Sequence, residues 1–141
     1  MEYIAHFRLE SGKLLIQTIK EHTDNVLRYS INNFNQLNLN SFISLIAILH
    51  DIGKYSDDFQ SYIKTAISET QKGSYDNRIK TAEKKDHGVY GAYYIFSKYG
   101  NCAGVQKLVA DIMTILICYH HGGLPDCTSG HIIPIVESVL L

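Results

Sequence analysis

Cysteine is scarce in this sequence, and so are the signals of export. The three cysteines, Cys102, Cys118 and Cys127, are odd in number and contain no Cys-x-x-Cys spacing. That pattern argues against a disulfide framework and against a zinc site built from thiolates. The opening MEYIAHFRLE has no charged-then-apolar secretory pattern, and the longest apolar run, residues 112–119, is far too short to cross a bilayer. We therefore expect a cytoplasmic protein.

An excess of charge is also missing. Lys and Arg number 13 against 14 Asp and Glu, which gives a formal net charge of −1. Contact with nucleic acid must therefore depend on a local site, because the overall charge would not attract it. With 141 residues, of which 45% are hydrophobic and 19% charged, the composition fits one ordinary globular domain.

Helical periodicity predicts an all-α bundle of five to six helices. A β-prone opening at residues 3–7 and a turn at residues 10–13 precede a first helix from Leu14 to about Phe34. A second helix, residues 42–51, is apolar nearly all round, as a central buried helix would be. A third begins at the capping sequence Ser56-Asp57-Asp58.

Two further helices are expected over residues 86–99 and 104–119. The second of these has an apolar stripe that predicts its buried face, formed by Val105, Leu108, Val109, Ile112, Leu116 and Tyr119.

Histidine is what the sequence has in abundance, with seven residues. Five of them fall at or beside core-facing helical positions or helix ends: His22, His50, His87, His120 and His121. In a helical bundle, side chains from facing helices can form one polar site at one end. At a helix end the backbone can unwind, and Gly53 and Gly122-Gly123 would make this easy, so that adjacent side chains turn to one place.

Imidazoles with a carboxylate favour Mn, Fe, Co, Ni or Zn over Mg or Ca. Asp51 is the only carboxylate in the set, and we expect it to bridge two ions. Lys54 is placed to meet a phosphate as a point charge. Taken singly, each of these features is more often structural, but together they favour a metal centre that hydrolyses phosphoesters. His6 and His131 are interpreted as structural or solvated.

The order His22, His50-Asp51, His87, His120-His121 resembles the HD superfamily of metal-dependent phosphohydrolases. The segments HDIGKYSDDFQSYI and HHGGLPD, with the opening YIAHF…SGK…IQTIKEHTDNV, are similar to the HD nuclease domain of the CRISPR-associated helicase-nuclease of type I systems. The resemblance covers essentially the whole chain. It implies a single HD domain over residues 1–141, as the N-terminal part of a longer domain or protein.

The resemblance also implies an activity, namely a metal-dependent endonuclease that cleaves single-stranded DNA. Its partners would be a helicase and an RNA-guided surveillance complex. By resemblance, His22, His50 and Asp51 match the ligands of one metal ion. Asp51 would be shared with a second ion, which His87, His120 and His121 complete, and Lys54 matches the lysine after the HD pair.

The sequence departs from the family at two points and leaves three alternatives. Gly88 stands where the family usually carries serine, and a distal aspartate ligand expected well beyond the histidine pair is not found. A cyclic-dinucleotide phosphodiesterase is disfavoured because GGLPD replaces the Gly-Tyr-Pro signature of those proteins. A nucleotide phosphohydrolase of the broader HD group and an inactive, truncated interaction module stay open.

Overall fold

A computed structural model describes residues 2–73 and 87–122. Its elements, in chain order, are β1 (Ile4–Glu10), β2 (Lys13–Thr18), α1 (Ile19–Phe34), η1 (Asn35–Leu37), α2 (Asn40–Leu49), η2 (Ile52–Tyr55), α3 (Asp57–Gln71), α5 (Gly88–Tyr99) and α6 (Gly104–Cys118). The expected helical fold is confirmed, with one small two-stranded antiparallel sheet added to it. Within the described residues, no helix is long and apolar enough to cross a membrane.

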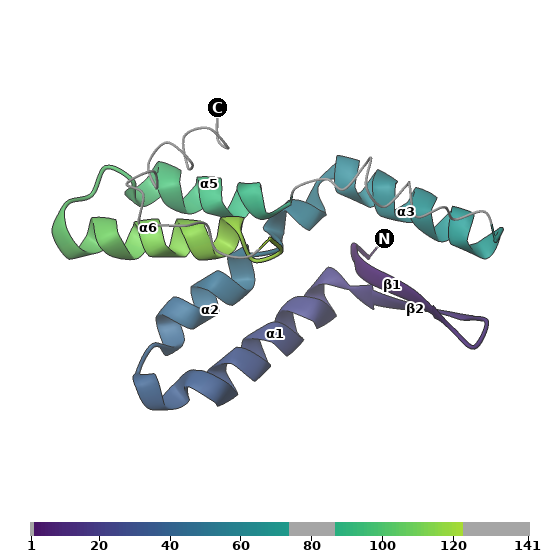
Figure 1. Cartoon of the computed structure of the whole chain (residues 1–141), viewed down its shortest axis with the longest axis horizontal. Coiled ribbons are helices and arrows are strands. Elements are labelled where there is room, and N and C mark those ends of the chain that lie inside the picture. Colours follow the sequence, from purple (N-terminus) through teal and green to yellow (C-terminus); the bar gives the residue numbers. More distant parts are fainter. Residues whose placement is uncertain (1, 74–86, 123–141) are drawn as a thin grey trace.

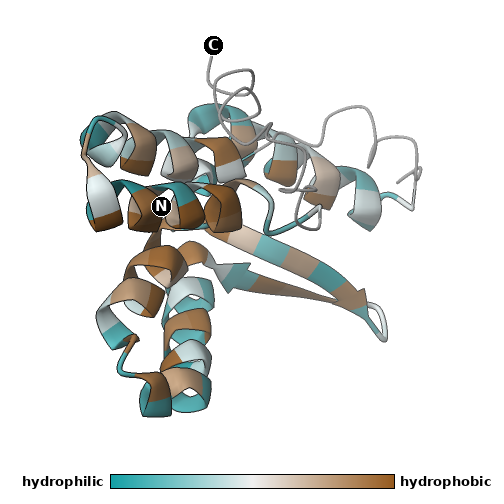
Figure 2. Cartoon of the chain, turned by 60° about the vertical axis from the view of Figure 1, so that its left-hand side comes forward, coloured by the Kyte–Doolittle hydropathy of each residue, from teal (hydrophilic) through white to brown (hydrophobic). Residues whose placement is uncertain are grey.

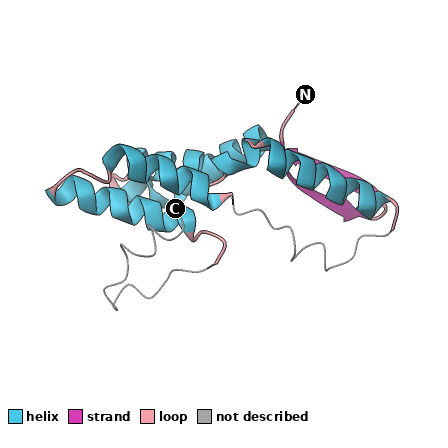
Figure 3. Ribbon diagram, turned by 90° about the horizontal axis from the view of Figure 1, so that it is seen from above, coloured by secondary structure: helices cyan, strands magenta, loops and turns pink. Residues whose placement is uncertain are grey.

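Three pairs of elements meet near the middle of the molecule (Figure 1). Helices α5 and α6 lie side by side, α1 and α2 form a helical hairpin, and α3 runs beside the β1–β2 hairpin. Seen from above, the α5–α6 pair occupies one end of an elongated molecule, and α3 with the strands occupies the other (Figure 3). The middle is thus a junction of helix ends.

The apolar core lies where α2, α5 and α6 pack together, and these helices carry much of the brown colour in Figure 2. Its buried members are Leu49, Ala92, Ile95, Ala110, Met113 and Ile117. Gly91 lets α5 approach the end of α2 closely, because a Cβ there would collide with the carbonyl of Leu49. Backbone contact this close fixes the start of α5 against the end of α2.

The helix expected from Leu14 begins later than predicted, and this part of the prediction is wrong. Residues up to Thr18 form β2, which follows a two-residue turn in which Ser11 and Gly12 have φ of 49° and 75°. Such turns match the twist of paired strands and therefore favour a hairpin. Helix α1 then starts at a capping box, in which Thr18 and Glu21 bond each other's backbone N–H.

The buried face of α6 also differs from the prediction. Val105, Leu108 and Ile112 are 76%, 59% and 42% exposed in the described structure, whereas the opposite face carries Ala110, Met113 and Ile117 into the core. Because α6 is apolar on most sides, a stripe of large residues does not identify the side that packs. Small Ala110 allows the close approach to α5 that the larger residues would prevent.

Helix α2 is likewise only half-buried: Ala47 and Leu49 are buried while Ile48 is 49% exposed. The all-round apolar pattern therefore overstates its burial, because α2 packs against α1 on one side and α5–α6 on another without being enclosed.

Candidate metal centre

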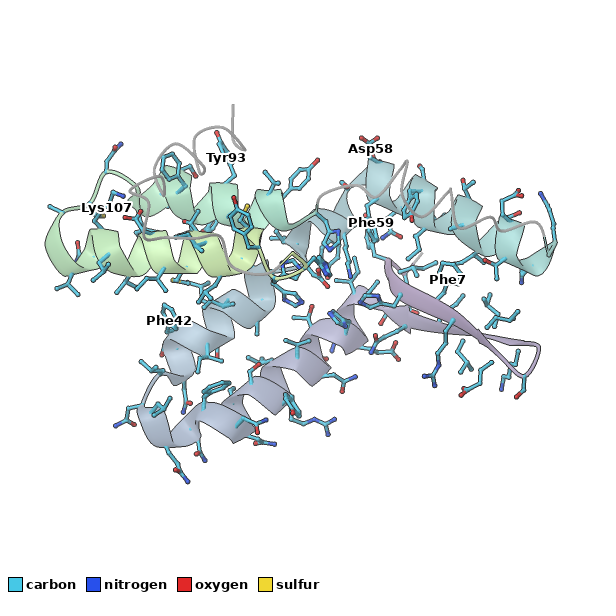
Figure 4. The ribbon with its side chains drawn as sticks, in the orientation of Figure 1. Phe7, Phe42, Asp58, Phe59, Tyr93 and Lys107 are labelled. Carbon is cyan, nitrogen blue, oxygen red and sulfur yellow. The ribbon has the colours of Figure 1, made fainter. Side chains whose placement is uncertain are left out.

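Asp51 is the centre of the junction between the helix ends. It follows α2 at the start of η2, and its side chain is only 2% exposed. Its Oδ2 lies 2.9 Å from Nε2 of His22, 3.3 Å from Nε2 of His50 and 2.8 Å from Nζ of Lys54. Its Oδ1 lies 3.1 Å and 3.4 Å from Nε2 of His87 and His120. Figure 4 shows nitrogen-bearing side chains gathered where α2 ends, between the start of α5 and the hairpin.

Despite these neighbours, neither carboxylate oxygen of Asp51 makes a hydrogen bond of acceptable geometry with any described residue. The nitrogen atoms thus surround the oxygens at ion-pair distances, although none of these contacts meets the angular requirements of a hydrogen bond. A buried carboxylate without hydrogen bonds costs several kcal/mol unless a positive charge lies close by. Lys54 supplies one such charge, and the surrounding imidazole nitrogens provide donors for a further cation.

His50 and His120 present the same ring nitrogen to Asp51 for the same reason. The Nδ1 of His50 lies 2.9 Å from the carbonyl of Ala47, and the Nδ1 of His120 lies 2.7 Å from the carbonyl of Ile117. A carbonyl only accepts, so Nδ1 carries the proton and donates. In each neutral ring the lone pair is then on Nε2, which faces the carboxylate. Two acceptors face each other unless a proton or a metal ion lies between them.

The imidazoles form two groups, one on each side of the carboxylate. On the Oδ2 side the Nε2 atoms of His22 and His50 are 3.2 Å apart, and on the Oδ1 side those of His87 and His121 are 2.7 Å apart. Donor atoms of Asp51, His87, His120 and His121 all lie within 4.8 Å of one another. Donor convergence of this kind suits a divalent metal ion.

The charges of the centre depend on one another. Burial alone would raise the pKa of Asp51, but the imidazoles of His120, His22, His50 and His87 outweigh it and hold this pKa far below its usual value. Burial lowers the pKa of Lys54, and the contact with Asp51 partly opposes that change. The lowered pKa favours the carboxylate form of Asp51, which is the form in which an aspartate can bind a metal ion.

Two imidazoles on the Oδ1 side shift in opposite directions. Burial, followed by repulsion from His120 and His87, lowers the pKa of His121 to about 4. Burial also disfavours a charged His120, but the contact with Asp51 outweighs this and raises the pKa of His120. A proton on Nε2 of His120 would occupy the place that a metal ion would take.

Close packing at helix ends positions the side chains of the cluster. A Cβ on Gly53 would collide with the carbonyl of His87, so this glycine lets the start of α5 lie directly on the turn that carries Asp51. The ring of Phe59, at the start of α3, lies 5.3 Å from the ring of His87 and 5.7 Å from Nζ of Lys54. Gly53 therefore permits close approach of the backbone. Its φ is not positive, so it does not end α2 in the left-handed conformation that is typical of a glycine after a helix.

The unwinding expected at the histidine pair is present, but Gly122 does not explain it. His120 and His121 lie in a turn beyond α6, which ends at Cys118, and the N–H of Gly122 donates to the carbonyl of Tyr119 at 3.0 Å. Gly122 has no positive φ, and a Cβ there would meet nothing within 4 Å. Gly123 is outside the described residues.

The structure thus brings together all six histidine and aspartate residues proposed from the sequence, from five separate elements. Lys54 also joins them, but it points inward: it is 1% exposed, and contact with a phosphate would require it to leave Asp51.

His6, which we had set apart as structural or solvated, belongs to the cluster as well. Its Nε2 lies 3.0 Å from Nζ of Lys54, and its ring centroid lies 4.6 Å from that of His22. Strand pairing is the sequence signal that could have identified His6, because pairing of β1 with β2 brings His6 back beside the start of α1. His131 is outside the described residues.

Comparison with known families supplies the deciding observation. The family model described as Cas3, HD domain, matches residues 11–134, which is most of the chain. The chain belongs to the Cas3 HD-domain family. Cas3 HD domains are metal-dependent nuclease domains of CRISPR systems, and the His/Asp cluster provides the donors for such a metal. No curated protein and no solved structure matched the chain.

The donor set fits the divalent metal that a Cas3 HD domain requires. Four imidazole Nε2 atoms surround a buried carboxylate whose oxygens have no hydrogen bond within the described residues. At Gly88, where the family usually has serine, a Cβ would lie 3.0 Å from the carbonyl oxygen of Ile117 and 3.2 Å from Cε1 of His120. In this member of the Cas3 family, glycine therefore allows α5 to pack tightly against the end of α6.

Proposed function

We propose that the chain is a metal-dependent endonuclease that cleaves single-stranded DNA in type I CRISPR interference. Family membership supports the metal-dependent nuclease chemistry. The observation that carries the proposal is the buried Asp51, whose two oxygens face imidazoles on both sides without hydrogen bonds from any described residue. A structural carboxylate would instead be satisfied by N–H donors.

We propose two ligand sets that share Asp51. His22 and His50 would hold one ion with Oδ2, and His87, His120 and His121 would hold the other with Oδ1. The ion is a divalent transition metal, namely Mn, Fe, Co, Ni or Zn, because imidazole donors disfavour Mg and Ca. A metal bound here would supply a hydroxide from its bound water and would polarise a phosphoryl oxygen.

The chain's own residues prepare the site for that chemistry. The bonds from Nδ1 of His50 and His120 to backbone carbonyls fix both rings with Nε2 toward Asp51. Lys54 stays in the proposed catalytic set, but we assign it another role than contact with a phosphate. Its ammonium orients Asp51 from within the core. Among the described residues of the Oδ1 group, His120 and His121 are the two in the exposed class, so we propose that a substrate approaches from their side.

The proposed partners follow from the same family. We propose that residues 1–141 form one HD domain that acts, in the cytoplasm, with a helicase and an RNA-guided surveillance complex that displaces the substrate strand. The local character of the site agrees with the near-zero net charge, since DNA delivered by partners needs no basic surface.

Circular single-stranded DNA is the test substrate, incubated with the metal-free protein to which Mn, Co or Ni is added back. We expect nicking of the circle. Asp51→Asn should reduce it at least about 100-fold, since even residues that merely orient metal ligands contribute 10- to 100-fold. The matched control is Asp24→Asn, which removes an exposed carboxylate paired with Lys20 on α1 and should retain activity.

The same protein provides a second readout. Metal should stabilise the unchanged chain by about 2.7 kcal/mol when its free concentration is 100 times the dissociation constant, and it should raise the melting temperature accordingly. It should not raise the melting temperature of Asp51→Asn. An intact circle combined with phosphate release from nucleotides would identify a nucleotidase. Metal binding with neither activity would identify an interaction module.

A further inference from the structure

The β-hairpin contributes a histidine to the centre through an irregular strand. In β1, Ile4 pairs with Thr18 and His6 with Gln17, so the register shifts by one residue and Ala5 is extra. Such bulges re-aim the next side chain and are common beside active sites. Ala5 is buried, at 2% exposed, while His6 lies on the exposed surface of the strand with Nε2 directed at Lys54.

Gln60 attaches this strand to the turn that carries the HD pair. Its Oε1 accepts from the N–H of Ile4 at 3.0 Å, and its Nε2 donates to the carbonyl of Ile4 at 2.9 Å and to that of Lys54 at 2.7 Å. The side chain is buried, with 4% of its surface exposed. One amide therefore ties the two backbone segments that carry His6 and Lys54, which are 48 residues apart in the chain.

Lys54 lies between two acceptors. Its Nζ is 3.0 Å from Nε2 of His6 and 2.8 Å from Oδ2 of Asp51. An ammonium only donates, so Nε2 of His6 accepts and the His6 proton is on Nδ1. If His6 were removed, Asp51 would be the one of these two groups that still attracts the ammonium. It would then compete more strongly with any cation that approaches Oδ2.

We propose that His6 is a positioning residue of the metal centre, which draws the Lys54 ammonium partly away from Oδ2 of Asp51, and that Gln60 holds His6 in place for this purpose. This proposal rests on the metal site of the proposed function, and it does not depend on DNA cleavage. It makes the hairpin part of the centre, although none of its residues is in the family's ligand set.

The experiment is a double-mutant cycle on Mn²⁺ binding, measured by calorimetry on the full chain. His6→Phe keeps a ring and removes the acceptor, and we expect about tenfold weaker binding, at the lower end of effects from groups that orient ligands. His6→Gln keeps an acceptor and should recover most of that loss. In a Lys54→Met background, His6→Phe should change the affinity little, because the group through which it acts is gone.

Two controls separate positioning from folding. Arg8→Gln alters a charged, exposed residue two positions further along β1 and should leave the Mn²⁺ affinity unchanged. Gln60→Met removes three hydrogen bonds at similar volume. It should speed hydrogen exchange at the amide of Ile4 and weaken Mn²⁺ binding as His6→Phe does, with little further loss when the two are combined.

Three other outcomes would overturn the proposal. Unchanged affinity in His6→Phe would mean that the His6–Lys54 contact has no influence on the metal. Equal losses with and without Lys54 would make His6 a ligand in its own right. Absence of Mn²⁺ binding by the unchanged chain would end both this proposal and the nuclease. A coupled cycle in a protein that cuts no DNA would end only the nuclease.

Discussion

The two sides of Asp51 are built by different means. On the Oδ1 side, His87 and His120 stand at the ends of α5 and α6, which pack through an apolar core and through glycines that admit backbone contact. On the Oδ2 side, His22 and Lys54 are placed by a capping box, a buried glutamine and a β-hairpin. Close packing fixes one set of donors, and directional hydrogen bonds fix the other.

One carboxylate can thus face two environments that are held together in different ways. Packing contacts are short-ranged and tolerate no added volume, so the Oδ1 side should be sensitive to size. Hydrogen bonds tolerate small movements but fail when a donor or acceptor is lost. Each side should therefore respond to a different kind of substitution, and the following experiments test that contrast.

The largest effect is expected from Gly91→Ala. The new Cβ would collide with the carbonyl of Leu49, and overpacking of this kind costs about 1–3 kcal/mol or more, which exceeds the roughly 1 kcal/mol gained in helix propensity. Urea unfolding measures the loss. Gly122→Ala is the matched control, since its Cβ meets nothing within 4 Å. Equal stability of the two variants would contradict the role of close packing.

A smaller effect is expected from Thr18→Ala on the other side. The substitution removes the capping box of α1, whose fourth residue is His22, and loss of such a cap costs about 1 kcal/mol. Thermal unfolding measures it. Thr65 lies at an exposed position of α3, so Thr65→Ala removes only a hydroxyl that donates to the carbonyl of Ser61 and should be nearly neutral. If both variants melt alike, the cap contributes nothing to this side.

The smallest effect concerns pH in the metal-free protein. Burial, and then Lys54, lowers the pKa of His6 to about 4, and burial lowers that of His121 to about 4. Because both values are below the ordinary 6.5, the unfolded chain binds more protons. The stability that these groups contribute is then fully present above pH 6.5 and is lost as pH falls toward 4. The raised pKa of His120 acts in the opposite direction and reduces the net slope.

Denaturation between pH 7 and 4.5 in the presence of chelator measures this slope. His6→Gln and His121→Gln should each make the curve shallower, one for each side of Asp51. Slopes that match the unchanged chain in both variants would show that neither imidazole is protonated on unfolding.

The residues that gather around Asp51 could be predicted from the sequence because their spacing is set by helix ends. His50, His87 and His120 each follow or precede a strongly periodic segment, and the ends of such segments are visible in the pattern. The cap at Ser56 was predicted for the same reason, and its side chain accepts from the N–H of Phe59.

What the sequence did not predict depends on contacts between distant segments. The helical stripe that began at Leu15 was overridden by pairing of β2 with β1, and the role of His6 depends on that pairing. The buried side of α6 could not be chosen because both faces are apolar, and the side that packs against α2 and α5 is the one that carries Ala110, Met113 and Ile117. These choices are made by tertiary packing, which local propensity does not encode.

The long sequence separations within the centre have a consequence for its synthesis. Ile4 bonds Gln60 across 56 positions, and His87 meets His121 across 34. As the chain emerges from a ribosome, β1 can pack against α1 early but must wait for α3 before Gln60 can bond Ile4, and His120 and His121 follow later still. The Lys54 ammonium, only three residues from Asp51, is available much earlier. The growing chain therefore carries its own temporary counter-charge for Asp51 until His120 and His121 have been translated.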